Sequence, residues 1–382
     1  MKTLKLIDDA AQAEPDAAAA GLRLRAVHRA AAELRRGVPV LLAGRELLVV
    51  MAAETAGAAG LTEFSALAAG PTVLLLAPVR AAAVLRRPVE PDAAALALQV
   101  GPLLFDPAAL RALADPTAEQ MLPEEATLAA HCPLDAPAAL ALAKLGRLLP
   151  AVLAAPARHD ALARAEQMRI LSVPGEDVLS YPAAMATGIV RVAEARVPLD
   201  GAPDARVVAF RAPDMGIEHL AILIGRPEEA EAPLARLHSE CFTGDLLGSL
   251  RCDCGPQLRG AILRMSEEGA GVLIYLAQEG RGIGLVNKLR AYALQDRGLD
   301  TLDANRALGW GADERNFLVA ATMLRQLGIP KIRLLTNNPD KLAAMAACGV
   351  EVTSREQHAF TPNGVNDGYL ATKAVRFGHL LD

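Results

Sequence analysis

Residues 271–297 read GVLIYLAQEGRGIGLVNKLRAYALQDR, a succession typical of a strand, a tight turn and a helix. The apolar run at 271–276 predicts a buried strand, and apolar residues at helical spacing follow at 282–297. Between them, glycines at alternate positions let the backbone approach a phosphate, and Arg281 can pair with that anion. Because the spacing G-x-G-x-G differs from the dinucleotide-binding fingerprint, an ordinary glycine-rich turn remains the alternative.

Strands and helices alternate on both sides of this stretch. The predicted strands are 206–211, 219–224, 271–276 and 331–336, and the predicted helices are 255–267, 282–297, 314–327 and 339–347. Such alternation favours a layered α/β domain. Ligands of these domains lie beyond the carboxyl ends of the strands, so the loops that follow 271–276 and 331–336 are candidate binding loops.

The first half of the chain differs in composition, being rich in alanine, leucine and proline. Its predicted elements are a helix at 17–36, strands at 38–43, 47–51 and 72–77, loops with short helices at 88–138, helices at 138–155 and 159–168, and a strand, turn and helix start at 169–181. The chain of 382 residues exceeds the size at which a single core stops growing, about 250–300 residues. We therefore expect two α/β domains, 1–189 and 190–382.

Composition and charge exclude several classes of protein. A hydrophobic fraction of 52% excludes a disordered chain, and a net charge of −5 excludes a protein that coats nucleic acid. Five cysteines are too few, and odd in number, for a disulfide scaffold. Asp8 and Asp9 interrupt any export signal, and the longest uncharged apolar stretch, between Glu63 and Arg80, is too short to cross a bilayer. A cytoplasmic protein with reduced thiols and no membrane partner is expected.

Three of the cysteines, Cys241, Cys252 and Cys254, are spaced C-x10-C-x-C. Thiolates are soft ligands that zinc prefers, and three of them with an open fourth position describe a catalytic site. On a strand, Cys252 and Cys254 would point to the same side, because side chains alternate with a period of two. The alternative is a closed structural site in which His238 is the fourth ligand.

Two further motifs precede predicted helices. In 311–315 (GADER), Asp313 and Arg315 are candidate site residues, although an acidic helix cap beside a solvated arginine explains the pattern equally. In 335–341 (LTNNPDK), Thr336 and Lys341 follow a strand and can hold a phosphate there. The alternative is an ordinary cap with a surface lysine.

Together these motifs resemble GTP cyclohydrolase II, the first enzyme of riboflavin biosynthesis. The resemblance rests on RLHSECFTGDLLGSLRCDCG, QEGRGIGL, NKLRAYALQD, GADER, RLLTNNPDK and YLATKAVRFGHLL, in this order from about residue 190 to the C-terminus. It implies a three-layer α/β/α domain with a mixed sheet, acting as a homodimer. It also implies hydrolysis of GTP to 2,5-diamino-6-(5-phosphoribosylamino)pyrimidin-4(3H)-one, formate and pyrophosphate.

The resemblance also implies roles for individual residues. Zinc would be bound by Cys241, Cys252 and Cys254, and magnesium would accompany the triphosphate. GTP would be bound by Arg236, Leu237, His238, Ser239, Glu240, Gln257, Glu279, Gly280, Arg281, Thr301, Thr336 and Lys341. Asp313 would accept a proton, Arg315 would attack the α-phosphorus, and Tyr292 would help to complete ring opening and deformylation. Since arginine stays protonated, stabilisation of transition-state charge is the sounder physical role for Arg315.

The first half resembles a degenerate 3,4-dihydroxy-2-butanone-4-phosphate synthase in 31–42, 45–55, 148–156 and 169–181. Arg45 and Glu46 match the acidic cluster by which that lyase binds magnesium, but Leu47 to Val50 replace the rest of it. Aliphatic side chains cannot coordinate a hard cation, so we expect no lyase activity and a role in dimerisation or support. The alternatives are a bifunctional enzyme, and a non-catalytic GTP-binding or zinc-structural protein. Retention of Tyr292, Asp313 and Arg315 together argues against the last.

Overall fold

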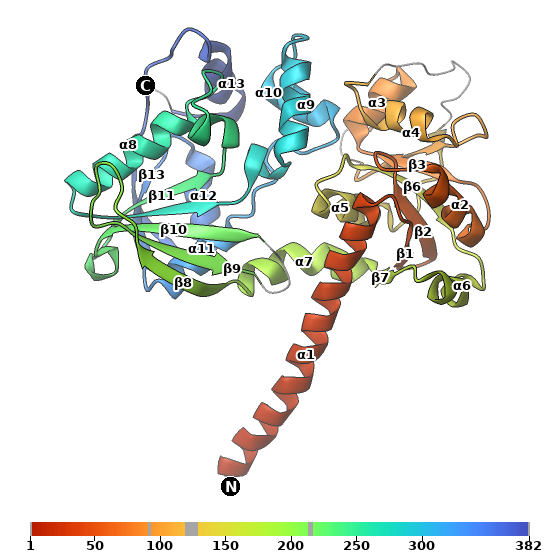
Figure 1. Ribbon diagram of the computed structural model, residues 1–382, viewed down its shortest axis with the longest axis horizontal. Helices are drawn as coiled ribbons and strands as arrows, with labels where there is room; N and C mark the ends of the chain where they lie inside the picture. The colour runs from red at the N-terminus through yellow and green to blue at the C-terminus, as the bar shows by residue number, and fades with distance from the viewer. Residues whose placement is uncertain (1, 91–92, 119–128, 213–216, 381–382) are drawn as a thin grey trace. The chain divides into compact units, whose positions relative to one another are not determined.

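The computed structural model describes residues 2–90, 93–118, 129–212 and 217–380, with side chains described from residue 19 onward (Figure 1). The chain divides into two compact units, each built on a sheet of its own. Unit 1 consists of Met1–Ala184 and Asn305–Gly311, and unit 2 consists of Met185–Ala304 and Ala312–Asp382. Within the described residues, no helix combines the length and apolar character needed to cross a membrane.

Unit 1 is an α/β unit with a seven-stranded sheet. In sheet order the strands are β5 (Ala129–Ala130), β4 (Leu96–Gln99), β3 (Val73–Leu76), β6 (Ala151–Pro156), β2 (Leu47–Ala52), β1 (Val40–Ala43) and β7 (Ser172–Pro174). The helices are α1 (Lys2–Arg35), α2 (Ala58–Leu67), α3 (Pro78–Leu85), α4 (Pro107–Ala114), α5 (Ala136–Leu145), α6 (Ala161–Met168) and α7 (Gly175–Thr187).

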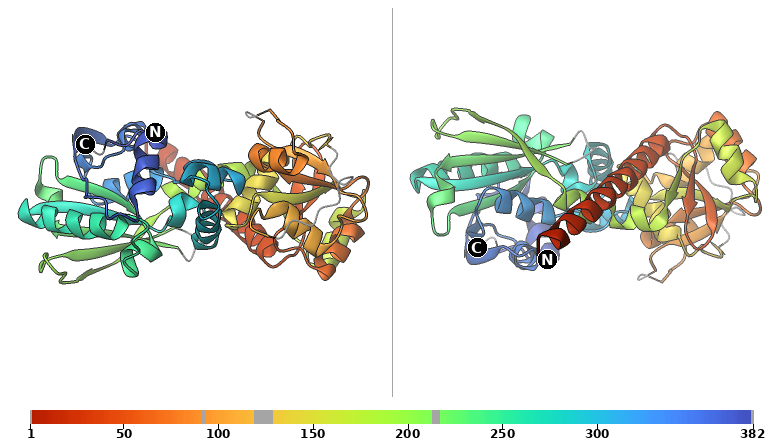
Figure 2. Two further views of the ribbon diagram at one scale, coloured as in Figure 1. Left: turned by 90° about the horizontal axis from the view of Figure 1, so that it is seen from above. Right: turned by 90° about the horizontal axis from the view of Figure 1, so that it is seen from below.

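Most of the elements predicted for this half are confirmed. The helix expected at 17–36 is the second half of α1, which is one continuous helix (Figure 2). Strands β1, β2 and β3 occupy the three predicted apolar runs. The stretch 88–138 contains α4 and also the short strands β4 and β5, while its residues 91–92 and 119–128 lie outside the described part of the chain.

One helix prediction in this half is wrong. The segment 138–155 does not form a single helix: α5 ends at Leu145, and 151–156 is the strand β6. The backbone has already left the helix before Pro150, and β6 is then paired on both sides, with β2 and with β3. A short, fully apolar, alanine-rich run has no amphipathic face, so periodicity cannot distinguish a buried strand from a buried helix there.

Unit 2 contains a mixed seven-stranded sheet. In sheet order the strands are β14 (Glu351–Glu356), β13 (Lys331–Leu335), β11 (Leu234–Ser239), β12 (Ala270–Leu276), β10 (Glu218–Gly225), β9 (Arg206–Arg211) and β8 (Val190–Arg196). The first four run parallel to one another, whereas β10, β9 and β8 form an antiparallel meander on β12. The helices are α8 (Cys254–Glu267), α9 (Leu285–Gln295), α10 (Thr301–Ala307), α11 (Leu318–Gln326), α12 (Pro339–Ala347) and α13 (Asp367–Phe377).

The sheet of unit 2 is covered on both faces, which confirms the expected three layers. Along β12, Val272 and Ile274 point into a core shared with α11 and α12, whereas Leu273 points into a second core shared with α8. This is the alternation that a strand imposes on its side chains. Figure 1 shows α8 over one face of the sheet and α11 over the other.

Three strands of this sheet were not predicted, β8, β11 and β14. β8 and β14 lie at the two edges and carry charged residues at many positions, so they lack a long apolar run. β11 reads LARLHS, and the polar residues that interrupt its pattern are themselves candidate site residues. Sequence patterns are weakest where a strand serves a site as well as the core.

Candidate active site

The three cysteines of unit 2 converge on one point. The ligand atoms of Cys241, Cys252 and Cys254 all lie within 4.8 Å of one another, and the Sγ atoms of Cys241 and Cys252 are 3.8 Å apart. Zinc–sulfur bonds of about 2.3 Å in a tetrahedron place two sulfurs roughly 3.8 Å apart. Within the described residues, this is the one group of three or more metal-ligating side chains, and its donor set and spacing fit zinc.

The convergence does not arise from a strand, as the sequence had suggested. Cys252 lies in an irregular turn and Cys254 is the first residue of α8, so a helix N-terminus presents the third thiol. Cys241 precedes the short π-helical turn η3 (Phe242–Leu246), and its Sγ accepts a hydrogen bond from the N–H of Gly244 at 3.3 Å. The hydrogen bond favours a thiolate at Cys241, because a backbone N–H donor stabilises negative charge.

A buried lysine links the cluster of Cys241, Cys252 and Cys254 to the glycine-rich turn, residues 278–284. Lys288 Nζ donates to Cys241 Sγ at 3.0 Å, to Thr243 Oγ1 at 2.9 Å and to Glu279 Oε1 at 2.8 Å. Burial opposes the charge, but the hydrogen bonds to Glu279 and Cys241 raise the pKa of Lys288 above its usual value. Glu279 also accepts from the N–H of Phe242 at 2.6 Å. This hydrogen bond holds residues 241–246, here called the metal loop, next to Glu279.

The thiols of the cluster do not titrate alike. Hydrogen bonds from Cys252 and Cys254, with a further contribution from Lys288, lower the pKa of Cys241. The hydrogen bond to Cys241 raises the pKa of Cys252, and hydrogen bonds within the cluster together with burial raise that of Cys254. A cation at this point would replace the shared protons, which is the usual coupling of metal binding to proton release.

His238 does not belong to the metal cluster. Its Nε2 lies 3.1 Å from both carboxylate oxygens of Asp245, which also accepts a hydrogen bond from Tyr275 Oη at 2.9 Å. Burial lowers the pKa of His238, so its ring is neutral and donates from Nε2. Its Nδ1 is buried and has no hydrogen-bond partner among the described atoms. A closed site with His238 as fourth ligand is therefore not what the structure shows.

The end of β11 supplies several of the predicted GTP-binding residues. Alternation places Arg236 and His238 on one face of the sheet, whereas the Leu237 side chain lies in the core on the other face. Only the backbone of Leu237 is thus available to a ligand, and its carbonyl accepts from Lys341 Nζ at 3.0 Å. Arg236 donates to the carbonyl of Leu335 at 3.0 Å and to the side chain of Gln257.

The loops after β12 and β13 lie at the same end of the parallel strands. In η4 (Glu279–Gly282), Gly280 and Arg281 both adopt left-handed φ angles, 64° and 63°. Arg281 is not glycine, so this backbone is strained, a feature that clusters at ligand-binding loops. After β13, the hydroxyl of Thr336 accepts from the N–H of Asn338 at 3.1 Å.

Lys341 and Arg236 give this edge its cationic character. Lys341 is buried, and burial together with the charges of Arg315 and Arg236 lowers its pKa well below the usual value. Burial likewise lowers the pKa of Arg236 to about 10. Their direct acceptors are neutral, carbonyl oxygens for both and the amide oxygen of Gln257 for Arg236, so a polyanionic ligand would balance their charge.

Asp313 and Arg315 pair with each other. Arg315 Nε donates to Asp313 Oδ1 at 2.7 Å, and a second guanidinium N–H reaches Oδ2. Although burial opposes it, this bidentate pair lowers the pKa of Asp313. The loop that carries the pair is tied to the glycine-rich turn, because the N–H of Glu314 donates to the carbonyl of Arg281 at 3.0 Å.

Ser239 ends β11, and the N–H of Glu240 after it donates to the carbonyl of Leu276 at 2.8 Å. Tyr292 lies on α9 and Thr301 at the start of α10. Tyr292 places its hydroxyl 3.4 Å from Thr243 Oγ1, next to the metal loop, and burial raises its pKa. Thr301 begins α10, where its hydroxyl accepts from Gln295 of α9 at 3.4 Å. The structure thus brings Tyr292 to the metal cluster, whereas the described hydrogen bond of Thr301 is directed to α9.

Three residues in or beside the metal loop were not predicted from the sequence: Gly244, Asp245 and Lys288. Gly244 and Asp245 lie within the quoted cysteine motif, and Lys288 lies within NKLRAYALQD. The spacing of the cysteines alone implies a tight turn between them, which could have drawn attention to Gly244. Lys288 could not have been found, since only the fold brings α9 to η3.

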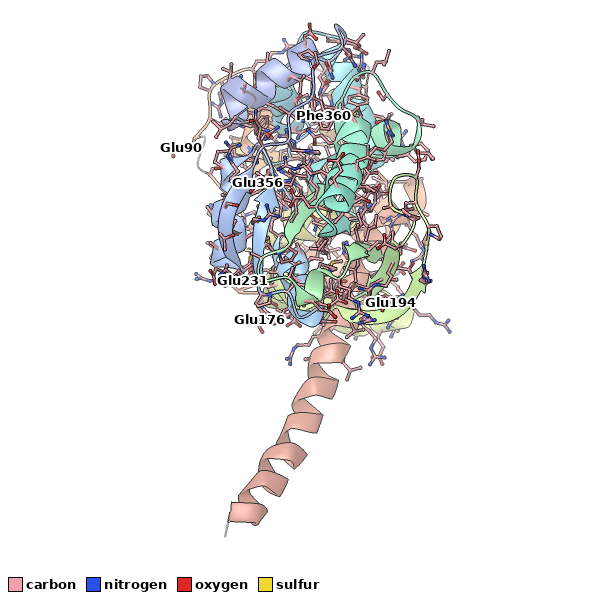
Figure 3. The ribbon with its side chains drawn as sticks, turned by 90° about the vertical axis from the view of Figure 1, so that its left-hand side faces the viewer. Glu90, Glu176, Glu194, Glu231, Glu356 and Phe360 are labelled. Atoms are coloured by element: carbon pink, nitrogen blue, oxygen red, sulfur yellow. The ribbon has the colours of Figure 1, made fainter. Side chains whose placement is uncertain are left out.

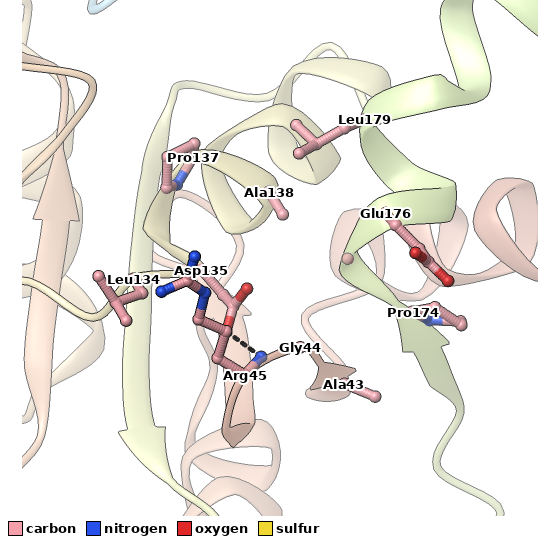
Figure 4. Close-up of a pocket in the computed structure, with 11 residues that line it drawn as sticks. Ala43, Gly44, Arg45, Leu134, Asp135, Pro137, Ala138, Pro174, Glu176 and Leu179 are labelled. Atoms are coloured by element: carbon pink, nitrogen blue, oxygen red, sulfur yellow. Dashed lines mark hydrogen bonds between the residues drawn. The ribbon is translucent and has the colours of Figure 1, made fainter.

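Unit 1 contains a separate cavity of about 470 Å³ (Figure 4). Its ionisable lining residues are Arg45, Asp135 and Glu176, and the backbone N–H of Arg45 donates to Asp135 Oδ2 at 2.9 Å. The aliphatic stretch that follows Glu46 forms β2, where Leu48, Val49 and Val50 are fully buried. These side chains therefore serve the core, and none of them can act as a metal ligand.

The stability of unit 2 is expected to fall as the pH is lowered, because His358 is buried. Its Nε2 lies 2.7 Å from the carbonyl of Gln257, and burial lowers the pKa of His358 to about 4. The unfolded chain, with a histidine pKa near 6.5, binds this proton more readily, so the stability present above pH 6.5 is lost between about 6.5 and 4. Through His358, the free energy of unfolding should be roughly 2 kcal/mol lower at pH 5 than at pH 7.5.

Urea unfolding of the wild type and of His358→Gln at the two pH values measures this contribution. The glutamine amide keeps a donor for the carbonyl of Gln257 but does not titrate, so the pH dependence of the variant should be smaller. Equal pH dependence in both proteins would contradict the assignment.

Comparisons with known proteins agree on the second half of the chain. The family model for GTP cyclohydrolase II matches residues 190–357. A GTP cyclohydrolase-2 of Azospirillum brasilense is 48% identical over 366 residues, covering 94% of this chain and 94% of that protein. A GTP cyclohydrolase-2 of Actinobacillus succinogenes is 52% identical over 193 residues, covering 50% of this chain and 88% of that protein.

Solved structures resemble the chain less closely. A two-domain 3,4-dihydroxy-2-butanone 4-phosphate synthase from A. baumannii is 18% identical, with a TM-score of 0.34, and covers 87% of this chain and 99% of its own. The relative from Azospirillum brasilense, in contrast, is matched along nearly its whole length, so this chain belongs to the GTP cyclohydrolase II family of enzymes.

Proposed function

We propose that the protein hydrolyses GTP to 2,5-diamino-6-(5-phosphoribosylamino)pyrimidin-4(3H)-one, formate and pyrophosphate, the first step of riboflavin biosynthesis. The observation that carries the proposal is the thiolate triangle of Cys241, Cys252 and Cys254, joined through Lys288 to the glycine-rich turn. The cysteines that would bind metal and the loops that would bind the anion lie at one end of the parallel strands, which supports a metal-assisted attack on a bound nucleotide.

The three cysteines would hold Zn²⁺ as a three-thiolate site with its fourth position open. When bound, zinc would supply a water of lowered pKa for attack on C8 of the guanine ring. The chain contributes the orientation: Lys288 balances the charge of the thiolates, and Glu279 holds the N–H of Phe242 so that the loop keeps its shape. Opening of the ring and hydrolysis of the resulting formamide release formate.

The cationic residues at the strand ends would bind the triphosphate with Mg²⁺. Arg281 lies in a turn whose backbone is exposed by neighbouring glycines, and Lys341 and Arg236 donate to neutral acceptors. His238 offers an unpaired Nδ1 acceptor toward a donor on the ligand. Binding of an anion should therefore offset the unfavourable free energy of burying these positive charges.

Asp313 and Arg315 would act at the phosphates. Because Asp313 holds Arg315 in a bidentate pair, the direction of its guanidinium is fixed. We infer that it stabilises the charge that develops as the bond between the α- and β-phosphates breaks, with Asp313 accepting a proton. Tyr292, whose pKa is raised by burial, would donate from its hydroxyl near the metal loop.

Incubation of the purified, zinc-loaded protein with GTP and magnesium tests the proposal. Formate and pyrophosphate should appear in equal amounts with the pyrimidine product. Absence of formate from a protein with one zinc per chain would refute it.

Substitution of Cys252 by serine should remove zinc and abolish formate release while leaving unit 2 folded. A hydroxyl is a much poorer zinc ligand than a thiolate, and the site should therefore lose at least about tenfold in affinity. Metal analysis, formate release and circular dichroism check the three parts. Loss of the fold with the metal would instead indicate a closed structural site.

For unit 1 we propose a non-catalytic role in support or homodimer formation. The support is chemical: Leu48 to Val50 are buried in β2, and the nearby cavity offers the carboxylates of Asp135 and Glu176 but no third one among its lining residues. Incubation with ribulose 5-phosphate and magnesium should yield no formate. Formate from that substrate would show unit 1 to be a working lyase, and sedimentation equilibrium tests the homodimer.

A further inference from the structure

The last part of the chain, residues 356–380, is here called the C-terminal segment. It packs against α8 where Phe360 meets Gly260: a Cβ at that glycine would lie 2.5 Å from Phe360 Cζ. Figure 3 labels Phe360 at this helix. Nearby, the imidazole of His358 stacks edge-on against the Phe360 ring, with 4.8 Å between centroids. The close approach fixes the segment beside the helix that begins with Cys254.

The segment then reaches the loops of the candidate site. The N–H of Leu380 donates to the carbonyl of Asn337 at 2.8 Å, directly after Thr336. The guanidinium of Arg281 lies 3.9 Å above the centre of the Phe377 ring. One helix, α13, thus contacts the glycine-rich turn, and the chain that follows it contacts the loop after β13.

The strongest of these contacts is a buried ion pair. Lys373 Nζ lies 2.6 Å from Asp253 Oδ1, and the two side chains are only 8% and 5% exposed. Asp253 separates Cys252 from Cys254 in the sequence, so its position and that of two metal ligands are linked. Its second oxygen, Oδ2, accepts from Gln257 Nε2 at 2.6 Å.

The ion pair continues into the binding edge. Gln257, whose amide N–H is held by Asp253, accepts from Arg236 through its own oxygen. The order of contacts is therefore Lys373, Asp253, Gln257, Arg236. Each side chain has its orientation set by the one before it, and the Asp253 carboxylate without Lys373 would be a buried charge lacking its cation.

We propose that Lys373 of α13 is a positioning residue of the site, which acts through Asp253 on Gln257, Arg236 and the turn that carries Cys252 and Cys254. The proposal rests on the function proposed above, since Gln257 and Arg236 are taken to contact GTP. Lys373 itself need not touch the substrate: it sets the direction in which the two side chains present their donors.

The test compares Lys373→Met, Lys373→Arg and the control Val375→Ala, each in the full-length chain. Methionine keeps the length of the side chain and removes the charge, whereas Val375 lies on the same helix and is 81% exposed. In Lys373→Met, the KM for GTP should rise about tenfold with a smaller change in kcat, because misdirected binding groups weaken substrate binding. Zinc should also pass to a chelator at least about threefold faster, since the turn between two ligands is less constrained.

Lys373→Arg, which restores the charge with a different shape, should fall between the wild type and Lys373→Met in both measurements. Val375→Ala should match the wild type. Unchanged KM and zinc release in Lys373→Met would overturn the proposal. If Lys373→Met does not fold, the KM of Lys373→Arg is the deciding measurement. A KM of Lys373→Arg equal to that of the wild type would then overturn the proposal.

The failure of the proposed function would look different. In that case the wild type and Val375→Ala would release no formate at all. Zinc transfer to the chelator and calorimetric binding of GTP do not require turnover, so they would still report whether Lys373 positions the site.

Discussion

Replacing Gly244 with alanine should empty the metal centre. A Cβ at this position would lie 2.6 Å from Cys252 Sγ and 3.0 Å from both Cys241 Sγ and Cys254 Cβ. These atoms belong to the three ligands, so the clash cannot be relieved without opening the thiolate triangle. Zinc affinity should fall by about 100-fold, the upper end of what changes around a metal site usually cost, and formate release should be lost with it.

Gly368→Ala provides the matched control. Gly368 lies in the first turns of α13 and has no atom within 4 Å of its would-be Cβ, so zinc content and activity should stay at wild-type values. Zinc per chain, measured after dialysis against a chelator, and formate release are compared in both variants. A Gly244→Ala protein that retains one zinc per chain would show that the thiolate spacing of the structure is wrong.

Removing the charge of Lys288 should have the second-largest effect. Lys288→Met leaves Glu279, which is 3% exposed, without its cation, and leaves the thiolate of Cys241 without its neighbouring positive charge. Breaking a buried ion pair from one side costs about 3–5 kcal/mol of unfolding free energy. Zinc affinity should also fall by about 10-fold or more, since a group next to a ligand has been removed.

Urea unfolding and zinc titration measure the two effects. Lys331→Met serves as control, because Lys331 makes its ion pairs with Glu231 and Glu351 at the surface, where salt bridges contribute little. Its unfolding and its zinc affinity should both stay close to those of the wild type. If Lys288→Met were as stable as Lys331→Met, the contacts of Lys288 would not be stabilising.

The sequence anticipated the parts of the site in which chemistry and spacing coincide. The three cysteines were singled out because soft ligands at short spacing have few other uses, and the structure confirms that they converge. Thr336 and Lys341 were proposed because they follow an apolar strand, and their contact with a phosphate stays a prediction. Parallel strands bring such loops to one edge, so their proximity follows from the fold class. The strands β10, β12 and β13 were found for the same reason, since their apolar runs are long.

What could not be predicted depends on contacts between distant segments. Lys288 meets Cys241, and Lys373 meets Asp253, across separations at which no periodicity carries information. The expected strand at Cys252 and Cys254 was wrong because two alternating positions are compatible with a strand and equally with a turn that enters a helix. The helix expected through 151–155 failed because an alanine-rich core has no polar face to reveal its period.

The order of strands in unit 2 also bears on how the site is assembled during folding. The meander of β8, β9 and β10 joins neighbours in the chain through short connections, whereas β11 pairs with β13 across the whole segment from Ser239 to Lys331. Closing a long loop costs more entropy than closing a short one, so pairing of the meander is favoured early and the parallel half forms late. The three cysteines and the cationic edge belong to that late half, together with the core residues of β11, β12 and β13, so we expect the candidate site to form only as unit 2 completes its core.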